Sequence, residues 1–94
     1  MKEIHIDCSV ITSREVLHDT FASTLHFPYW YGRNLDALYD CLTGIGEPVM
    51  IYFTCWPTTA EALGTYAHGV QAVFTDAAKA NPNLSVRFQE KTER

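Results

Sequence analysis

The first quarter of the chain alternates apolar and polar residues and then changes to a helical spacing. Residues 3–10, EIHIDCSV, place every second side chain on one side, ending with Val10, and this period predicts a β-strand. Thr12 and Glu15 follow at the spacing of a capping box, in which a hydroxyl and a carboxylate bond the backbone at a helix start. We therefore expect a strand and then a helix over about residues 13–25.

The middle of the chain predicts a second helix and a second strand. Residues 26–32 read as a loop because proline and glycine interrupt any regular pattern there. Asn34 is a good N-cap, and Gly44 is a residue type that commonly ends a helix, so we expect a helix between them. The nearly continuous apolar run 48–56, PVMIYFTCW, is typical of a strand covered on both faces, as in parallel sheets.

The last third predicts two helices and a final strand. Thr58 and Glu61 form a second possible capping box, which would open a short helix ending near Gly64. A longer helix ends at Asn81-Pro82, and residues 84–88 read as a short strand. The order β-α-α-β-α-α-β predicts an α/β fold, with a small three-stranded parallel sheet and crossover helices. We expect the aromatic core to contain Phe21, Tyr39, Phe53 and Phe74.

Composition narrows the class of protein. The length of 94 residues fits one domain over residues 1–94, and 47% hydrophobic with 19% charged residues fits a folded chain. The sequence shows no membrane span and no secretory signal, so we expect a cytoplasmic protein. Cys8, Cys41 and Cys55 are odd in number and widely spaced, which favours buried reduced thiols over a disulfide framework or a zinc site. We expect no metal and no cofactor.

Acidic residues are concentrated in the middle of the chain. Residues 34–78 contain no Lys or Arg, so the formal net charge of −4 is due to this segment. Such a charge distribution disfavours nucleic acid as a partner and favours a basic protein. The acidic residues of the segment are Asp36, Asp40, Glu47, Glu61 and Asp76.

Two of these carboxylates share a face of the second predicted helix. Asp36 lies in the first turn, where the helix dipole favours a negative charge. Asp40 has no such explanation, and like charges four positions apart destabilise a helix by about 0.2–0.5 kcal/mol. A solvated helix face would tolerate this, but Trp30 and Tyr31 lie just before the helix, where aromatic residues are either core or anchors of a protein interface.

The segment around this helix resembles a known family. Residues 28–44, PYWYGRNLDALYDCLTG, are similar to the signature segment of the barstar family, whose members are intracellular inhibitors of the ribonuclease barnase. The resemblance implies a barstar-like fold and a non-enzymatic inhibitor of a barnase-type ribonuclease, with an antitoxin or self-protection role. It also implies a monomer that forms a 1:1 complex with its basic target, its carboxylates taking the place of phosphates.

The resemblance also implies which residues contact the enzyme. Asp36 and Asp40 match the two key carboxylates, and Asp76 falls where the family has Glu. Ile45 stands in place of a contacting Trp, and Tyr29 in place of an acidic residue. The full set of implied partner-binding residues is Trp30, Tyr31, Asn34, Asp36, Asp40, Thr43, Gly44, Ile45 and Asp76.

Two other functions stay open at this point. A barstar-like module could bind a partner that is not a ribonuclease, because a fold does not fix a function. A small hydrolase could use a histidine together with an aspartate, with the histidine as general base. No HExxH or similar spacing supports a catalytic metal. The histidines are His5, His18, His26 and His68.

Overall fold

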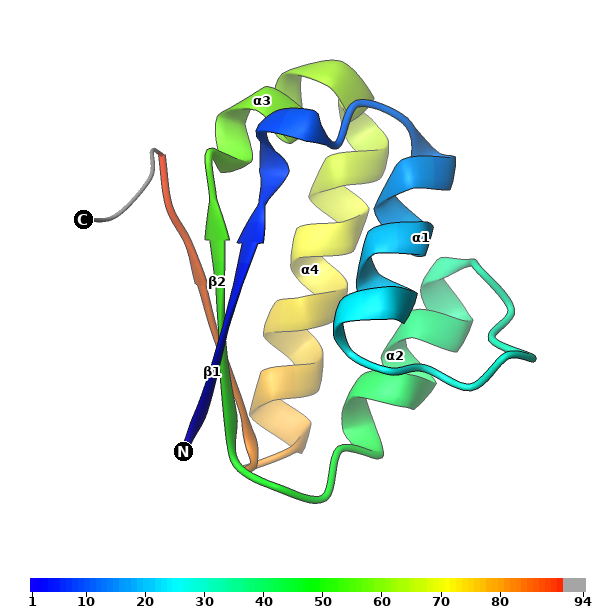
Figure 1. The fold of residues 1–94 in the computed structure, drawn as a ribbon, viewed down its shortest axis with the longest axis vertical. Coiled ribbons are helices and arrows are strands. Elements are labelled where there is room, and N and C mark those ends of the chain that lie inside the picture. Colours follow the sequence, from blue (N-terminus) through cyan, green and yellow to red (C-terminus); the bar gives the residue numbers. More distant parts are fainter. Residues whose placement is uncertain (91–94) are drawn as a thin grey trace.

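The computed structural model describes residues 1–90 (Figure 1). Its order of elements confirms the predicted α/β class and the order β-α-α-β-α-α-β, with one short 3-10 helix added. The last four positions of the domain predicted over residues 1–94 lie outside the described residues. The elements are β1 (Lys2–Asp7), η1 (Cys8–Val10), α1 (Arg14–Thr24), α2 (Leu35–Thr43), β2 (Val49–Thr54), α3 (Trp56–Leu63), α4 (Thr65–Ala80) and β3 (Leu84–Phe88).

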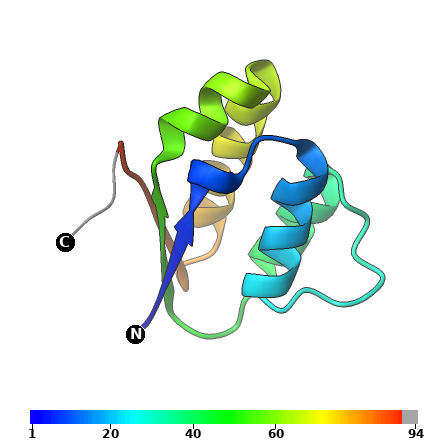
Figure 2. The ribbon, with the colours of Figure 1, turned by 45° about the horizontal axis from the view of Figure 1, so that its top comes forward.

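The three strands form a parallel sheet in the order β1-β2-β3, with Ile51 of β2 opposite Ile4 and Val86. The helices lie on one face of this sheet, so the molecule has two layers (Figures 1 and 2). The prediction that the central strand is covered on both faces is therefore wrong. Ile51 is fully buried, whereas Tyr52 points the other way and is only partly buried.

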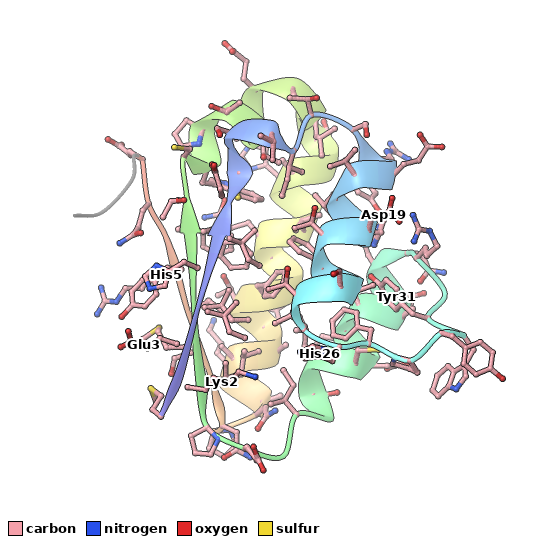
Figure 3. The ribbon with its side chains drawn as sticks, in the orientation of Figure 1. Lys2, Glu3, His5, Asp19, His26 and Tyr31 are labelled. Carbon is pink, nitrogen blue, oxygen red and sulfur yellow. The ribbon has the colours of Figure 1, made fainter. Side chains whose placement is uncertain are left out.

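The outer face of the sheet carries polar and mixed side chains. Glu3 and His5 project there, away from the helices (Figure 3). The ring of His5 stacks on that of Tyr52 on the neighbouring strand, with 4.6 Å between the ring centroids. This stack shields part of the exposed sheet face without a covering helix.

The core lies between the sheet and the helices and is built around aromatic rings. Phe21, Phe53 and Phe74 are fully buried, as predicted, and meet edge to face with centroid distances of 4.7–5.9 Å, a favoured geometry for aromatic pairs. The prediction for Tyr39 is wrong: its side chain is 36% exposed. α2 buries only a narrow stripe centred on Leu38 and Leu42, and Tyr39 lies at the margin of that stripe.

The first strand is shorter than its alternating pattern predicts. The carboxylate of Asp7 accepts hydrogen bonds from the backbone N–H of Ser9 (2.9 Å) and from its hydroxyl (2.6 Å), which begins η1. The turn ends the alternation, so Val10 is 65% exposed rather than buried.

Two helix starts also differ from the prediction. The N-cap of α1 is Ser13, whose hydroxyl accepts from the N–H of Val16, and not Thr12. α3 begins at Trp56, ahead of the predicted capping box at Thr58. Trp56 is buried against the core, and a proline in the first turn of a helix has no N–H that needs a partner.

The three cysteines differ in how deeply they are buried. Cys8 is fully buried, and burial raises the pKa of its thiol to about 12. Cys41 and Cys55 are only partly buried, so the expectation of buried thiols holds for Cys8 alone.

Within residues 1–90, none of the helices has the length and apolar character needed to cross a membrane.

Candidate protein-binding face

The start of α2 is fixed by local hydrogen bonds. The side-chain oxygen of Asn34 accepts from the N–H of Ala37 at 2.8 Å, as predicted for an N-cap, and its amide donates to the carbonyl of Gly32 at 3.3 Å. Asn34 thereby joins the preceding loop to the helix. Its exposed side chain forms hydrogen bonds within the chain, so Asn34 helps to shape the exposed side of α2.

Asp36 and Asp40 lie one helical turn apart on the exposed side of α2. At 3.6 residues per turn, four positions bring two side chains to within about 40° of each other around the axis. Neither carboxylate forms a hydrogen bond or an ion pair with any residue among the 90 that are described. Both anions are therefore available to a partner.

The base nearest to them in the sequence is already paired. The guanidinium of Arg33 lies 2.7 Å from the carboxylate of Asp19 on α1, and this is the single ion pair within residues 1–90. The same guanidinium donates to the carbonyl of Glu15 at 3.3 Å. Arg33 therefore turns toward α1, and among residues 1–90 no Lys or Arg forms an ion pair with the carboxylates of α2.

The end of α2 adds small and polar groups to the same face. The hydroxyl of Thr43 is within hydrogen-bond distance of the carbonyls of Tyr39 (3.0 Å) and Asp40 (3.2 Å), and exposed Gly44 is the C-cap. Tyr39, placed in the core by the sequence prediction, belongs to this partly exposed face. The signal for it was its position in the helix, three and four residues from Asp36 and Thr43.

The loop between α1 and α2 presents one aromatic pair outward. Tyr29 is 99% exposed and Trp30 is 70% exposed. The backbone is left-handed near each end of the loop, at His26 (φ 58°) and Arg33 (φ 57°), a conformation that non-glycine residues rarely adopt. The loop projects beside α2 (Figure 1).

Tyr31, the next residue, points into the molecule. Its ring is 7% exposed and packs against Phe27, with 4.8 Å between the centroids. Its hydroxyl lies 2.7 Å from Nδ1 of buried His18, and burial raises the pKa of Tyr31. The structure therefore places Tyr31 beneath the face rather than on it.

A groove joins the loop to α2. Its walls come from the loop on one side and from the C-terminal half of α2 on the other, and it encloses about 360 Å³. Four predicted site residues meet there, namely Trp30, Asp40, Gly44 and Ile45. Partly buried Cys41 also lines it, and the pKa of this thiol is raised by burial and by the Asp40 carboxylate.

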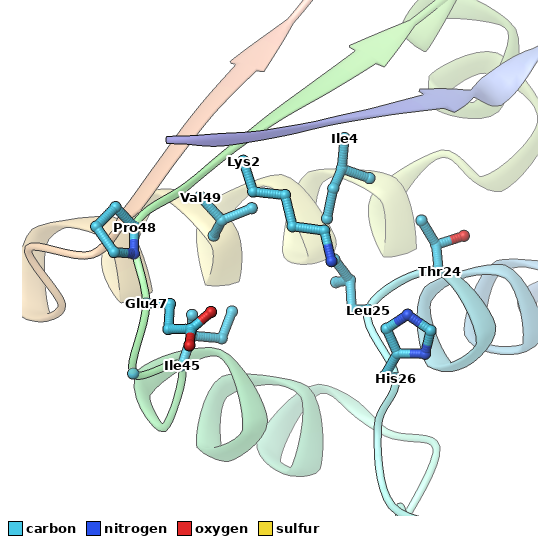
Figure 4. Close-up of a pocket in the computed structure, with 10 residues that line it drawn as sticks. Lys2, Ile4, Thr24, Leu25, His26, Ile45, Glu47, Pro48 and Val49 are labelled. Carbon is cyan, nitrogen blue, oxygen red and sulfur yellow. The ribbon is translucent and has the colours of Figure 1, made fainter.

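A second hollow continues from the first toward the sheet. The two share Leu25, His26 and Ile45 as lining residues. The second is bordered by Lys2 of β1 and by Glu47 in the turn before β2 (Figure 4). Charged groups of both signs therefore surround its apolar floor.

Asp76 is not part of either hollow. It is exposed on α4, the helix that packs beside α2. The two helices approach closely where Gly69 faces Leu35: a Cβ atom at position 69 would lie 2.9 Å from Leu35 Cδ1. The structure thus places Asp76 on the helix that packs against α2, outside the groove.

The histidines and potential metal ligands are dispersed. His5 lies on the outer sheet face, His18 is buried beneath the loop, and His26 and His68 are exposed on separate segments. No group of three or more His, Cys, Asp or Glu residues within residues 1–90 could hold a metal ion.

Comparison with known proteins shows the family of this chain. The family model described as Barstar (barnase inhibitor) matches residues 1–91. The chain is also 42% identical over 78 residues to a Bacillus subtilis (strain 168) protein named "Putative ribonuclease inhibitor YrdF". The matched region covers 82% of this chain and 86% of that protein. Because the family model matches nearly the whole sequence, this chain belongs to the Barstar (barnase inhibitor) family.

Proposed function

We propose that this protein inhibits a ribonuclease of the barnase type by covering its cationic active site. The observation that carries the proposal is the pair Asp36 and Asp40, exposed on one side of α2 and without partners among the described residues. Family membership and the name of the Bacillus subtilis relative support the same function.

The physical basis of inhibition is substitution for the substrate. A ribonuclease site must bind phosphate oxygens with Arg, Lys or His donors, and a carboxylate offers the same donors a strong acceptor. Two carboxylates one helical turn apart would occupy two such positions and exclude RNA. The repulsion between them, which destabilises the isolated helix slightly, would be relieved by the cations of the enzyme.

The rest of the face supplies shape and apolar contact. Trp30, Gly44 and Ile45 line the groove beside Asp40, so a side chain of the enzyme could enter there. Tyr39 adds a partly exposed ring on α2, and Asp76 adds negative charge from α4. We assign Asn34, Thr43 and Tyr31 chiefly to shaping this face, because each side chain already bonds within the protein.

The proposal includes a non-catalytic, cofactor-free mode of action. One inhibitor would bind one enzyme in the cytoplasm, as an antitoxin that protects the producing cell. The base-free segment 34–78 would give long-range attraction to a basic enzyme and speed their encounter.

Direct binding to a purified barnase-type ribonuclease tests this function. We expect a 1:1 complex without ribonuclease activity. Asp40→Asn keeps the shape and removes the charge, and we expect it to raise Kd by at least about tenfold, because hydrogen bonds to a charged group contribute about 1.5–3 kcal/mol. An Asp40→Asn protein that binds as tightly as the parent would refute the proposed site.

The matched control is Glu61→Gln. Glu61 is an exposed acid of the same base-free segment, but it lies on α3. The variant removes the same net charge at a different place, so we expect a change in Kd below about twofold. Equal losses for Asp40→Asn and Glu61→Gln would indicate a general charge effect and no specific contact.

A second candidate is an interaction module with a non-ribonuclease partner. Ile45 favours it, because this residue lines the groove and stands where the resemblance implies a contacting Trp. Purifying the complex from the native host and assaying the partner for RNA cleavage separates the two. A stoichiometric partner without nuclease activity would replace the first proposal.

A further inference from the structure

We propose that His18 is a positioning residue that holds the loop between α1 and α2 in its binding conformation. The inference rests on the proposed function for its effect on affinity, but not for its effect on the loop. Its basis is a buried bridge between three parts of the chain. Nδ1 of His18 lies 2.7 Å from the hydroxyl of Tyr31 in the loop, and Nε2 lies 2.7 Å from the hydroxyl of Tyr66 on α4.

The bridge is well shielded from solvent. His18 is 3% exposed and Tyr31 is 7% exposed. The ring of Tyr66 is partly buried and is covered by the guanidinium of Arg14, 4.1 Å from the ring centroid. Buried hydrogen bonds of this length fix both partners, because an unmade bond in such a place is costly.

Tyr31 is the inner anchor of the loop. Its N–H donates to the carbonyl of Pro28 at 3.0 Å, which closes the turn that carries the exposed Tyr29 and Trp30. Figure 3 shows Tyr31 on the side of the loop that faces α1, whereas the loop tip extends outward. A shift of the Tyr31 ring would therefore move Trp30 relative to the acidic side of α2.

The protonation state of His18 decides how well the bridge is satisfied. A neutral imidazole has one N–H donor and one bare nitrogen, so one tyrosine hydroxyl accepts and the other donates. A protonated ring donates on both sides, and the hydroxyl that had donated to it must turn its proton elsewhere. The added cation would also lie close to existing positive charge. The charged and titratable groups around His18 are Arg14, Glu15 and Asp19 of α1, Tyr31 and Arg33 of the loop, and Tyr66 of α4.

Two amide substitutions divide the bridge. The amide of Asn reaches the position of the Nδ1 atom, and the longer Gln reaches that of Nε2. His18→Asn should therefore keep the bond to Tyr31, and His18→Gln should keep the bond to Tyr66. Tyr31→Phe and Tyr66→Phe remove the same two bonds from the other side while keeping each ring.

Hydrogen exchange of the loop amides, residues 29–34, is the direct readout. We expect exchange about tenfold faster in His18→Gln and Tyr31→Phe, and within about twofold of the parent in His18→Asn and Tyr66→Phe. Exchange of the β2 amides serves as the internal reference. Loop exchange equal to that of the parent in both His18→Gln and Tyr31→Phe would overturn the inference.

The pH profile and the affinity provide separate checks. After correction for the intrinsic rate, loop exchange should accelerate in the parent as the pH falls from about 6.5 to about 5, and should not do so in His18→Asn. Kd for the ribonuclease should rise about fivefold in His18→Gln and Tyr31→Phe and less than twofold in the other two. Kd values that follow folding stability across all four variants would reduce His18 to a structural role.

The two proposals can fail independently. If no ribonuclease binds while the loop exchanges as expected, the proposed function fails and the positioning role stands. If the enzyme binds the parent and Asp40→Asn weakens that binding, but substitutions at His18 leave hydrogen exchange of the loop unchanged, the positioning role fails alone.

Discussion

The side-chain amide nitrogen of Asn81 lies 3.0 Å from the carbonyl oxygen of Ile45, and it donates a second bond of 3.0 Å to the carbonyl of Leu42. The amide oxygen accepts from the N–H of Asn83 at 3.0 Å. Both donor hydrogens and the oxygen of this buried side-chain amide are therefore hydrogen-bonded. The residue that ends α4 thus also fixes the end of α2, next to the groove.

Asn81→Ala should therefore lower the free energy of unfolding by about 1–3 kcal/mol, because the carbonyls of Leu42 and Ile45 each lose one donor and the N–H of Asn83 loses its acceptor. Asn81→Asp keeps the shape of the side chain but places a carboxylate oxygen against those same carbonyls, so it tests the hydrogen bonds more directly. We expect Asn81→Asp to be less stable than Asn81→Ala near neutral pH and to recover in acid. Urea titrations at two pH values test this, and equal stability of both variants would contradict it.

Stability in weak acid should depend on His18. Burial and the nearby Arg33 guanidinium lower the pKa of His18 in the folded protein, while the unfolded chain has a value near 6.5. The unfolded state thus binds the proton first, so the contribution of neutral His18 is complete above about pH 6.5 and is lost as the pH falls below it.

Chemical unfolding of the parent and of His18→Asn, compared between about pH 5 and pH 7.5, measures this contribution. We expect the parent to lose more stability than the variant over that interval. The carboxylate of Asp7, whose pKa is lowered by its bonds to Ser9, should act only at lower pH. The same slope in both proteins would show that another group is responsible.

Thr59 should link α3 to η1 through its hydroxyl. The side chain is fully buried, and its oxygen lies 2.9 Å from the carbonyl of Cys8 and 2.8 Å from that of Ile11. Thr59→Val keeps the volume and removes the donor, and we expect a loss of about 1–3 kcal/mol. Thr59→Ser keeps the hydroxyl and should lose less, as measured by thermal or urea unfolding. A larger loss for Thr59→Ser would indicate that packing of the methyl group dominates.

The approach of α2 to α4 should appear as a coupling between Gly69 and Leu35. Alanine in a helix is favoured over glycine by about 1 kcal/mol. At position 69, however, its Cβ would meet Leu35 Cδ1 at 2.9 Å. Gly69→Ala should therefore stabilise the Leu35→Ala background more than the parent, and a double-mutant cycle measures the difference. Additive effects would show that Leu35 moves aside freely.

The encounter with a ribonuclease should be sensitive to salt. The base-free segment gives a negative surface whose attraction is screened over about 10 Å at 0.1 M salt. We expect the association rate constant to fall steeply with ionic strength, and to fall less in Asp36→Asn. Stopped-flow measurements at several salt concentrations test this. A rate constant independent of salt would remove the proposed role of long-range attraction.

Local signals in the sequence were sufficient for most of the fold. β3 was predicted at the residues where it lies, because an Asn-Pro pair marks the end of the preceding helix. The N-cap Asn34 and the C-cap Gly44 were also correct, since both act within a few residues of themselves. Thr12 and Ser13 are adjacent hydroxyl residues, and no local rule separates which of them caps α1.

What the sequence could not provide depended on contacts between distant segments. Tyr31 and His18 are 13 positions apart, and Tyr66 is a further 35 along the chain, so nothing in the local pattern shows that they meet. The exposure of Tyr39 depends on how narrow a side of α2 the rest of the chain covers. The apolar run of β2 predicted two covered faces, and nothing within that run shows that all the helices pack on one face of the sheet.

The two-layer arrangement also determines how the molecule can be handled. The outer face of the sheet, with Arg87 exposed on β3, looks away from α2 and from the aromatic loop tip. A biosensor surface, a fluorophore or a fusion partner attached there would leave the acidic side of the molecule facing solution. The same preparation could then be used to screen any set of nucleases without blocking the region under study.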